Sequence, residues 1–334
     1  MQTRKIGPYT VSAVSLGCMN LSHAYGTPPD RKTAQTILNT ALDLGCTHLD
    51  TASLYGFGAN ETLIGETVMH RRSEFMLASK CGLFRNAEGV REVDGSPETV
   101  RRVTEDSLKR LKTDVIDLHY LHRWDKRYPI EECVGVMADM VKEGKIRQIG
   151  LCEVSAETLR KAHAVHPIAA LQTEYSIWTR NPELGVLDTC RELGIGFVAF
   201  SPMTRGFLCG AVRDMAKLPE KDIRQWMPRF QGENFERNLK LLPDYEKIAR
   251  DAGHSMAEIT LAWVLAQGDH IVPIPGTTSL AHLKENFGAA EITLDADTRE
   301  RMDTLVNQKT VAGPRYTAKT QREIDTETFP GEYD

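Results

Sequence analysis

The stretch FMLASKCGLFRNAEGVREVDGSPETVRRVTEDSLKRLKTDVIDLHYLH, residues 75–122, contains a strand, a helix and a second strand. Its ends, FMLASKC (75–81) and DVIDLHYLH (114–122), are apolar without strict alternation, which is typical of strands buried on both faces. Between them, Ser96 and Pro97 suit the N-cap and the first position of a helix. The apolar side of this helix continues through Val100, Val103, Leu108 and Leu111. A helical crossover of this kind predicts two parallel strands.

The same order of strand and helix repeats along the chain. Six further apolar segments are predicted as strands, at 11–17, 47–51, 146–154, 168–175, 195–202 and 271–276. Helical patterns occur at 30–44, 60–69, 129–145, 155–165, 183–194, 234–252, 255–267 and 279–290. Gly45 and Gly144 lie where helix C-termini favour glycine. Eight strand-helix units predict an α/β protein with a (β/α)8 TIM barrel.

A doubly wound sheet is the competing interpretation of these units. It would place a glycine-rich dinucleotide-binding turn after the first strand, but LGCMNLSHAYG (16–26) contains no G-x-G-x-x-G. We therefore favour one barrel domain over residues 1–334. We expect an N-terminal β-hairpin in the first twelve residues, a long irregular loop at about 202–235 after the seventh strand, and a peripheral tail at 309–334.

Composition excludes several classes of protein. The formal net charge of −5 argues against nucleic-acid binding, which needs a concentrated basic surface. No apolar run reaches the length of about 20 residues that a membrane span needs, and the N-terminus lacks the apolar core of a signal peptide. The seven cysteines are scattered without a CxxC motif, which argues against a metal site or a disulfide framework. These features predict a cytoplasmic protein with neither a nucleic-acid nor a membrane partner.

Polar residues follow or end three neighbouring strands. Asp50 ends the second predicted strand, Lys80 lies at the end of the third and His122 at the end of the fourth, while Tyr55 follows the second strand. Active sites of (β/α)8 barrels lie at the carboxyl ends of the strands. We therefore expect these four side chains to converge at one mouth of the barrel.

The four residue types suit proton donation. A free tyrosine has a pKa of about 10 and is a weak acid at neutral pH. The ammonium of Lys80 is expected to lower the pKa of Tyr55, and the carboxylate of Asp50 to keep Lys80 charged. Tyr55 then protonates an oxygen that gains negative charge, and His122 donates a hydrogen bond to the same oxygen.

Each of these residues alone also has a structural explanation, as a turn aspartate, a strand-end lysine, a packed tyrosine or a structural histidine. Their occurrence together at equivalent positions favours the functional interpretation. His119 points to the opposite face of its strand from His122, so it is expected in the barrel wall. Tyr25, Phe84 and Trp124 follow strand ends and are candidate walls of a substrate pocket.

Several motifs in this order resemble those of the aldo-keto reductases. They are HLDTASLYGFGANE (48–61), LASKCG (77–82), DVIDLHYLHR (114–123), IGLCEVS (149–155), LQTEYSIW (171–178), AFSPMTRGFL (199–208) and IPGTTSLAHLKENFGAA (274–290). The resemblance runs from about Lys5 to Ala290, and GCMNLSHAYG (17–26) is similar to the bacterial and plant branch. It implies NADPH-dependent reduction of an aldehyde or ketone to an alcohol on a barrel without a Rossmann fold. Tyr55 would be the general acid, tuned by Lys80 and Asp50; His122 would orient the carbonyl, the nicotinamide would deliver hydride, and no metal would take part.

The resemblance also implies a set of cofactor contacts. Gln172 matches a residue that binds the nicotinamide carboxamide, Cys152 and Glu153 replace a polar pair of the family, and Phe200 takes the place of a stacking aromatic. Further contacts are implied at Met19, Asn20, Asp50, Ser201, Pro202, Met203, Arg205, Gly206, Gly276, Thr278, His282, Glu285 and Asn286. Thr278 and His282 stand where many relatives carry Lys or Arg for the 2′-phosphate, so NADPH is the expected cofactor and NADH the alternative.

Two other functions remain open at this point. A Schiff-base enzyme of the aldolase type would use Lys80 as its nucleophile. A cofactor-sensing binding subunit, of the kind that the family's potassium-channel β-subunits represent, would keep the four residues without needing turnover. The expected partner in the favoured interpretation is a small carbonyl compound, whose identity the sequence leaves open together with the oligomeric state.

Overall fold

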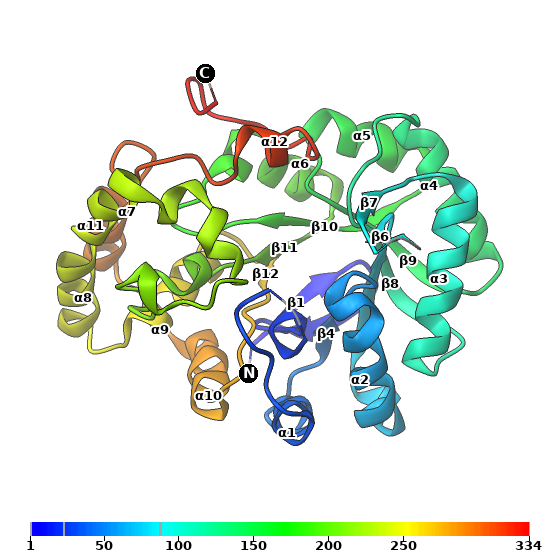
Figure 1. The fold of residues 1–334 in the computed structure, drawn as a ribbon, viewed down its shortest axis with the longest axis horizontal. Helices are drawn as coiled ribbons and strands as arrows, with labels where there is room; N and C mark the ends of the chain where they lie inside the picture. The colour runs from blue at the N-terminus through cyan, green and yellow to red at the C-terminus, as the bar shows by residue number, and fades with distance from the viewer. Residues whose placement is uncertain (1, 23, 87–88, 334) are drawn as a thin grey trace.

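A parallel eight-stranded sheet forms the centre of the molecule (Figure 1). The computed structural model describes residues 2–22, 24–86 and 89–333. In spatial order the strands are β12 (Ile271–Pro273), β11 (Gly196–Phe200), β10 (Ile168–Glu174), β9 (Ile146–Cys152), β8 (Ile116–Leu121), β5 (Met76–Cys81), β4 (His48–Asp50) and β3 (Leu16–Gly17). The amide of Ser15 donates to the carbonyl of Pro273 at 3.0 Å, which links the two outer strands. The predicted (β/α)8 barrel is therefore confirmed.

After each barrel strand, one helix covers the outer face of the barrel. These helices are α1 (Arg31–Asp43), α2 (Ala59–Thr67), α3 (Pro97–Leu111), α4 (Ile130–Lys142), α5 (Ala156–Val165), α6 (Val186–Leu193), α9 (Met256–Leu265) and α10 (Leu280–Gly288). The predicted cap at Ser96 is present, because its hydroxyl accepts the amide of Thr99 at 3.3 Å. Among the described residues, no helix is both long and apolar enough to span a membrane.

The N-terminal hairpin closes the end of the barrel opposite the strand carboxyl ends. Its strands are β1 (Thr3–Ile6) and β2 (Tyr9–Ser12), and Ile6 packs with the apolar residues of the barrel interior. Gly196 permits this contact, since a Cβ there would lie 3.1 Å from the carbonyl oxygen of Lys5. The predicted strand 11–17 is divided in the structure, because its first two residues pair in the hairpin.

Additional elements lie around the carboxyl ends of the strands. A second hairpin, β6 (Leu83–Arg85) and β7 (Arg91–Val93), interrupts the connection between β5 and α3. The helix predicted over 234–252 is two helices, α7 (Gly232–Leu239) and α8 (Leu242–Asp251), and Pro243 lies at the start of the second. Proline has no amide hydrogen, so it suits a helix start and breaks a helix interior.

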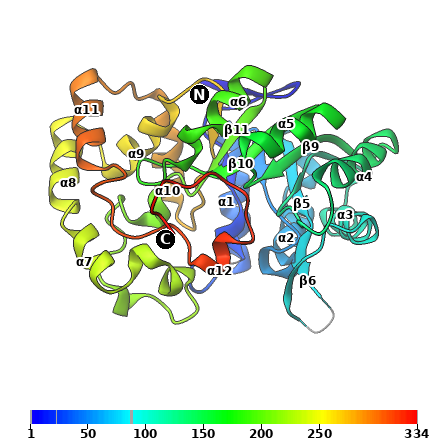
Figure 2. The ribbon, with the colours of Figure 1, turned by 90° about the horizontal axis from the view of Figure 1, so that it is seen from above.

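The segment after α11 (Ala296–Leu305) crosses this end of the molecule (Figure 2). It includes the short helix α12 (Ala318–Gln321) and was expected to be peripheral. Instead, the Arg315 guanidinium is buried and pairs with Glu153 at 2.6 Å, and Asp325 accepts the Ser155 hydroxyl at 2.9 Å. These polar contacts attach the tail to the loop after β9, which its polar composition did not indicate.

Candidate active site

Strand register brings the four predicted catalytic residues together. Asp50 is the last residue of β4, and Lys80 lies near the end of the neighbouring strand β5. His122 follows β8, the next strand of the sheet. Tyr55 begins a 3-10 turn, Tyr55–Gly58, after β4. The rings of Tyr55 and His122 meet edge to face with their centroids 5.9 Å apart.

Lys80 is the centre of a buried polar cluster. Its ammonium forms an ion pair with Asp50 Oδ1 and donates to the carbonyl of Thr51 at 2.8 Å and to the Tyr55 hydroxyl at 3.3 Å. The other carboxylate oxygen, Asp50 Oδ2, accepts the side-chain amide of Gln172 at 2.7 Å. Because Lys80 and Asp50 are almost completely buried, their charges balance each other with little help from solvent.

The electrostatics of this cluster differ from the sequence expectation at one point. Burial raises the pKa of Tyr55 to about 12, although the nearby ammonium of Lys80 lowers it in part. For Lys80 itself, burial is the largest single effect and lowers the pKa, but the charge and hydrogen bond of Asp50 act together with Tyr55 and Cys152, and the net pKa is raised. The hydroxyl and the ammonium therefore both carry their protons at neutral pH. The effect of burial on the Tyr55 pKa exceeds that of the Lys80 charge because Tyr55 is buried, and its position in a loop did not indicate this burial.

His119 has the structural role that the strand pattern predicted. It is fully buried, and its Nε2 lies 3.0 Å from the hydroxyl of Thr104 on α3, outside the barrel wall. Burial lowers the pKa of His119 to about 3, so the ring is neutral. It takes no part in the cluster around Lys80.

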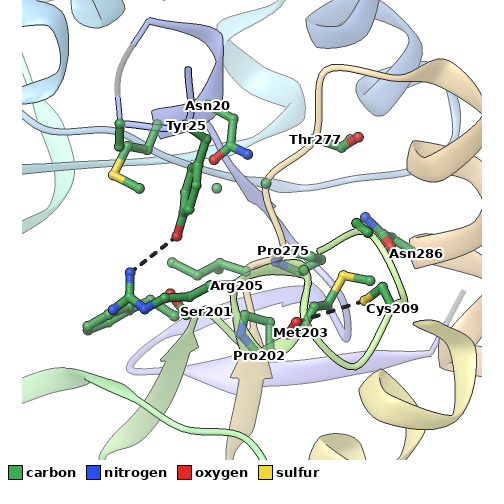
Figure 3. A pocket seen from close by; sticks show the side chains of 18 of the residues that line it. Asn20, Tyr25, Ser201, Pro202, Met203, Arg205, Cys209, Pro275, Thr277 and Asn286 are labelled. Carbon is green, nitrogen blue, oxygen red and sulfur yellow. Dashed lines mark hydrogen bonds between the residues drawn. The ribbon is translucent and has the colours of Figure 1, made fainter. Parts of the chain in front are cut away.

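A cavity of about 1000 Å³ borders this cluster and is lined by Asp50, Tyr55 and His122. Figure 3 shows another part of its lining, in the loops that follow the strands. Most of the residues predicted to bind cofactor or substrate line it. They are Met19, Asn20, Tyr25, Asp50, Tyr55, His122, Cys152, Gln172, Phe200, Ser201, Pro202, Met203, Arg205, Gly206, Gly276, His282, Glu285 and Asn286. Lys80 is not part of the cavity lining, but its ammonium contacts two lining residues, Asp50 and Tyr55.

Four predicted residues lie outside the cavity lining. Glu153 is buried against Arg315 instead, and Thr278 is exposed while its neighbour Thr277 lines the cavity. Phe84 lies under the guanidinium of Arg102, 5.0 Å from the ring centroid. The indole of Trp124 donates to the carbonyl of Tyr128 at 2.8 Å and packs on the main core. Arg315 and Arg102, which hold Glu153 and Phe84, come from distant parts of the chain that sequence spacing does not show.

The loop after β11 is strained where it borders the cavity. Ser201, Thr204 and Arg205 have φ values of 49°, 51° and 55°, a conformation that costs about 1–3 kcal/mol per non-glycine residue. Arg205 is anchored by a buried ion pair with Glu174 at 2.6 Å. Its guanidinium also donates to the hydroxyl of Tyr25 at 3.2 Å, so this bond spans the cavity between two loops (Figure 3).

Sequence reasoning missed several lining residues. Arg91 of β7, Arg213, Cys209 and Tyr316 all border the cavity. No sequence pattern indicated that Tyr316 lines the cavity, because it lies in the C-terminal tail. Arg123 also lines the cavity, and its position directly after His122 was the one sequence signal that could have identified it.

The barrel, with a polar cluster and a large cavity at the carboxyl ends of its strands, has the architecture of a barrel enzyme. Residues 13–307 match the model of the aldo/keto reductase family, to which this chain belongs. It is an oxidoreductase of that family.

Two curated relatives align over nearly the whole chain. The chain is 43% identical to the aldo-keto reductase yakc [NADP(+)] of Schizosaccharomyces pombe, over 98% of each protein. It is 41% identical to the probable aldo-keto reductase 1 of Glycine max, over 95% of this chain and 92% of that protein. Both relatives carry the family name in their own descriptions.

Solved structures share the fold. The glycerol dehydrogenase AKR11B4 from Gluconobacter oxydans superposes with a TM-score of 0.84 at 27% identity, over 93% of this chain and 97% of that one. The holo form of the aldo-keto reductase AKR11C1 from Bacillus halodurans gives 0.75 at 28% identity, over 92% and 97%.

Proposed function

We propose that this protein uses NADPH to reduce an aldehyde or a ketone to the corresponding alcohol, with Tyr55 as the proton donor. One observation carries the proposal: the fully buried ammonium of Lys80 links the Asp50 carboxylate to the Tyr55 hydroxyl at the floor of the cavity. Oxidoreductase chemistry of the family needs a proton at that position when a carbonyl oxygen gains negative charge. A bound reduced nicotinamide supplies the hydride.

Each residue of the cluster has a different role in the proposed reaction. Tyr55 remains protonated at neutral pH, since burial raises its pKa to about 12. Lys80, whose pKa is raised, presents a positive charge 5.0 Å from the Tyr55 ring and stabilises the phenolate that forms when the proton leaves. Asp50, held by Gln172, fixes the position of Lys80. His122, against the ring of Tyr55, orients the carbonyl oxygen.

The cavity suits a dinucleotide. Its volume of about 1000 Å³ is at the upper end of ligand sites in proteins. Asn286 Oδ1 is buried with no hydrogen-bond partner among the described residues, and an adenine amino group would satisfy it. Gly276 leaves room beside Asn20, because a Cβ there would lie 2.7 Å from Asn20 Oδ1. At the start of α10 the amide of His282 donates to the Ser279 hydroxyl, and the other amides of the first turn, which have no acceptor within the helix, are suited to a phosphate.

NADPH is proposed over NADH because the relative from Schizosaccharomyces pombe, which aligns along nearly the whole chain, is named for NADP(+). In this chain the start of α10 carries Ser279 and His282 and no Lys or Arg in its first turn. We infer that hydroxyl groups, backbone amides and His282 hold the 2′-phosphate, with less electrostatic stabilisation than a guanidinium would give.

Replacing His282 by arginine is therefore expected to tighten NADPH binding by about tenfold and to change NADH binding much less, since charged hydrogen bonds contribute about 1.5–3 kcal/mol. Fluorescence titration of each cofactor measures the two Kd values. Leu280→Arg is the matched control, because it adds the same charge to an exposed position of the same turn outside the cavity. Equal changes for both cofactors would show that residue 282 does not contact the 2′-phosphate.

Turnover is tested directly by following nicotinamide absorbance with a panel of aldehydes, ketones and sugars, with NADPH and NADH in separate assays. We expect consumption of NADPH that depends on the carbonyl compound. Cofactor binding without turnover on any compound would instead favour the cofactor-sensing binding subunit.

A Schiff-base mechanism on Lys80 fits the observations less well. The raised pKa of Lys80 keeps the amine protonated, and its ion pair with Asp50 engages it. A protonated amine is no nucleophile. Borohydride treatment with a carbonyl compound is expected to leave Lys80 unmodified, and a reduced adduct on Lys80 by mass spectrometry would contradict the reductase mechanism.

A further inference from the structure

Arg123 places a positive charge in the cavity directly beside the catalytic cluster. It follows His122 and lines the cavity with a half-buried side chain. Its Nη1 donates to the carbonyl of His122 at 2.7 Å, and no carboxylate among the described residues pairs with it. Burial raises the pKa of the Cys152 thiol to about 12, while the positive charges of Lys80 and Arg123 oppose this effect. Arg123 and Cys152, the last residue of β9, both line the cavity.

The other charges on this side of the cavity are balanced. Asp50 is paired with Lys80, and Arg91 is paired with Glu323 at 2.5 Å. Arg205, in the loop after β11, is paired with Glu174. Arg250 and His254 belong to α8 and the turn after it, next to α9 and across the barrel from β8. Arg123 is thus the cation near Tyr55 and His122 that has no acidic partner in the described part of the chain.

Apolar side chains surround the same part of the cavity. Leu54 and Leu83 pack with Tyr55 and line the cavity, and Met19 packs against them. Such a pocket binds a carbon skeleton through burial of apolar surface and leaves the guanidinium as its charged contact. A half-buried arginine without a carboxylate partner is an anion-binding group, because its planar fork matches a carboxylate with two parallel hydrogen bonds.

We propose that Arg123 determines substrate specificity by pairing with a carboxylate on the carbonyl compound, so that the preferred substrates are oxo acids and not neutral aldehydes or ketones. The proposal rests on the function proposed above and specifies its substrate class. One unbalanced positive charge matches a carboxylate, which carries one negative charge. A phosphate ester carries nearly two, and the nearby Arg91 is already paired with Glu323.

The test compares substrates that differ in one charge. The three isomers of carboxybenzaldehyde and their methyl esters share one ring and one aldehyde, and the isomers place the carboxylate at three distances from the carbonyl. We expect wild-type kcat/KM with NADPH to favour at least one acid over its ester by tenfold or more. Raising the salt concentration is expected to reduce this preference by increasing the KM of the acid.

The variants Arg123→Gln and Arg123→Lys connect the preference to this side chain. In Arg123→Gln the ratio of acid to ester kcat/KM is expected to fall to about one, and Arg123→Lys is expected to keep part of it. NADPH titration and thermal unfolding report whether each variant folds and binds cofactor. A purely structural role, through the bond to the His122 carbonyl, would instead lower kcat/KM for acid and ester by the same factor.

Each other outcome has a definite meaning. No preference for any acid in the wild type, or equal losses for acid and ester in Arg123→Gln, overturns the proposal for Arg123 while the reductase function stands. Stronger preference for para-formylphenyl phosphate than for the acids overturns the assignment of a carboxylate. If no NADPH is consumed with any acid, ester or neutral carbonyl compound, the proposed function is overturned and this inference with it.

Discussion

Replacing Tyr55 by phenylalanine is expected to lower kcat for carbonyl reduction by about 10²–10⁴-fold, the usual contribution of a positioned general acid. The change removes one oxygen atom. The ring and its edge contact with His122, 5.9 Å between centroids, remain possible. The ion pair of Lys80 with Asp50 also remains. Stopped-flow measurement of NADPH oxidation gives the rate, and fluorescence titration gives the NADPH Kd, which is expected to change less than about twofold.

The matched control is Tyr9→Phe. This residue lies in the N-terminal hairpin at the closed end of the barrel, where its hydroxyl contacts Asp117 at 3.4 Å. Its loss is expected to leave kcat unchanged. Retained turnover in Tyr55→Phe, with the control equally active, would contradict the role of Tyr55 as proton donor.

The pH dependence of the wild-type kcat tests the protonation of the Tyr55 hydroxyl. Because the pKa of Tyr55 is raised to about 12, the hydroxyl keeps its proton through the neutral range. Reduction is therefore expected to show no loss of kcat from Tyr55 titration between neutral and mildly alkaline pH. A decline of kcat centred below pH 10 and absent from Tyr55→Phe would show that the hydroxyl titrates earlier than its burial indicates.

Replacing Arg315 by methionine is expected to lower the free energy of unfolding by about 3–5 kcal/mol, because it leaves the buried carboxylate of Glu153 without its partner. The two side chains are 2% and 0% exposed, and the guanidinium also donates to Thr326 at 2.8 Å. Glu153 has a φ of 56° and accepts the amide of Glu174 at 2.8 Å, so the same contact supports β10 near the cavity. Urea denaturation measures the change.

Two further variants separate charge burial from disturbance of the tail. Arg322→Met removes an exposed arginine from the same segment and is expected to change stability by less than about 0.5 kcal/mol. The double variant Glu153→Gln, Arg315→Met removes both charges and is expected to recover part of the loss. A change below about 1 kcal/mol in Arg315→Met would show that the pair does not hold the tail in place.

The sequence predicted the barrel because local signals there agree with the long-range fold. The strand-helix rhythm, the cap at Ser96 and the glycine at 45 are all present in the structure. The structure differs from the prediction where a single residue interrupts the helical periodicity, as Pro243 does at the break between α7 and α8. The hairpin β6–β7 was missed because its strands have three residues each, too short for a periodic signal.

The convergence of the candidate site was predictable from the ends of the strands, whereas the burial and displacement of individual side chains were not. Asp50, Lys80 and His122 follow from the ends of three neighbouring strands. The raised pKa of Tyr55 and the displacement of Phe84 come from tertiary burial, which no local pattern records. Tyr316 lines the cavity because long-range contacts, among them the pair of Arg315 and Glu153, anchor the tail.

The proposed reaction is tested most directly by isotope transfer. The wild-type protein is supplied with NADPH carrying deuterium at C4 of the nicotinamide and with a carbonyl compound that the absorbance screen identifies. Mass spectrometry of the product is expected to show the alcohol with one deuterium on the former carbonyl carbon, in a yield that matches the NADPH consumed. An alcohol without deuterium from either C4 position, or NADPH oxidation without alcohol, would contradict the account.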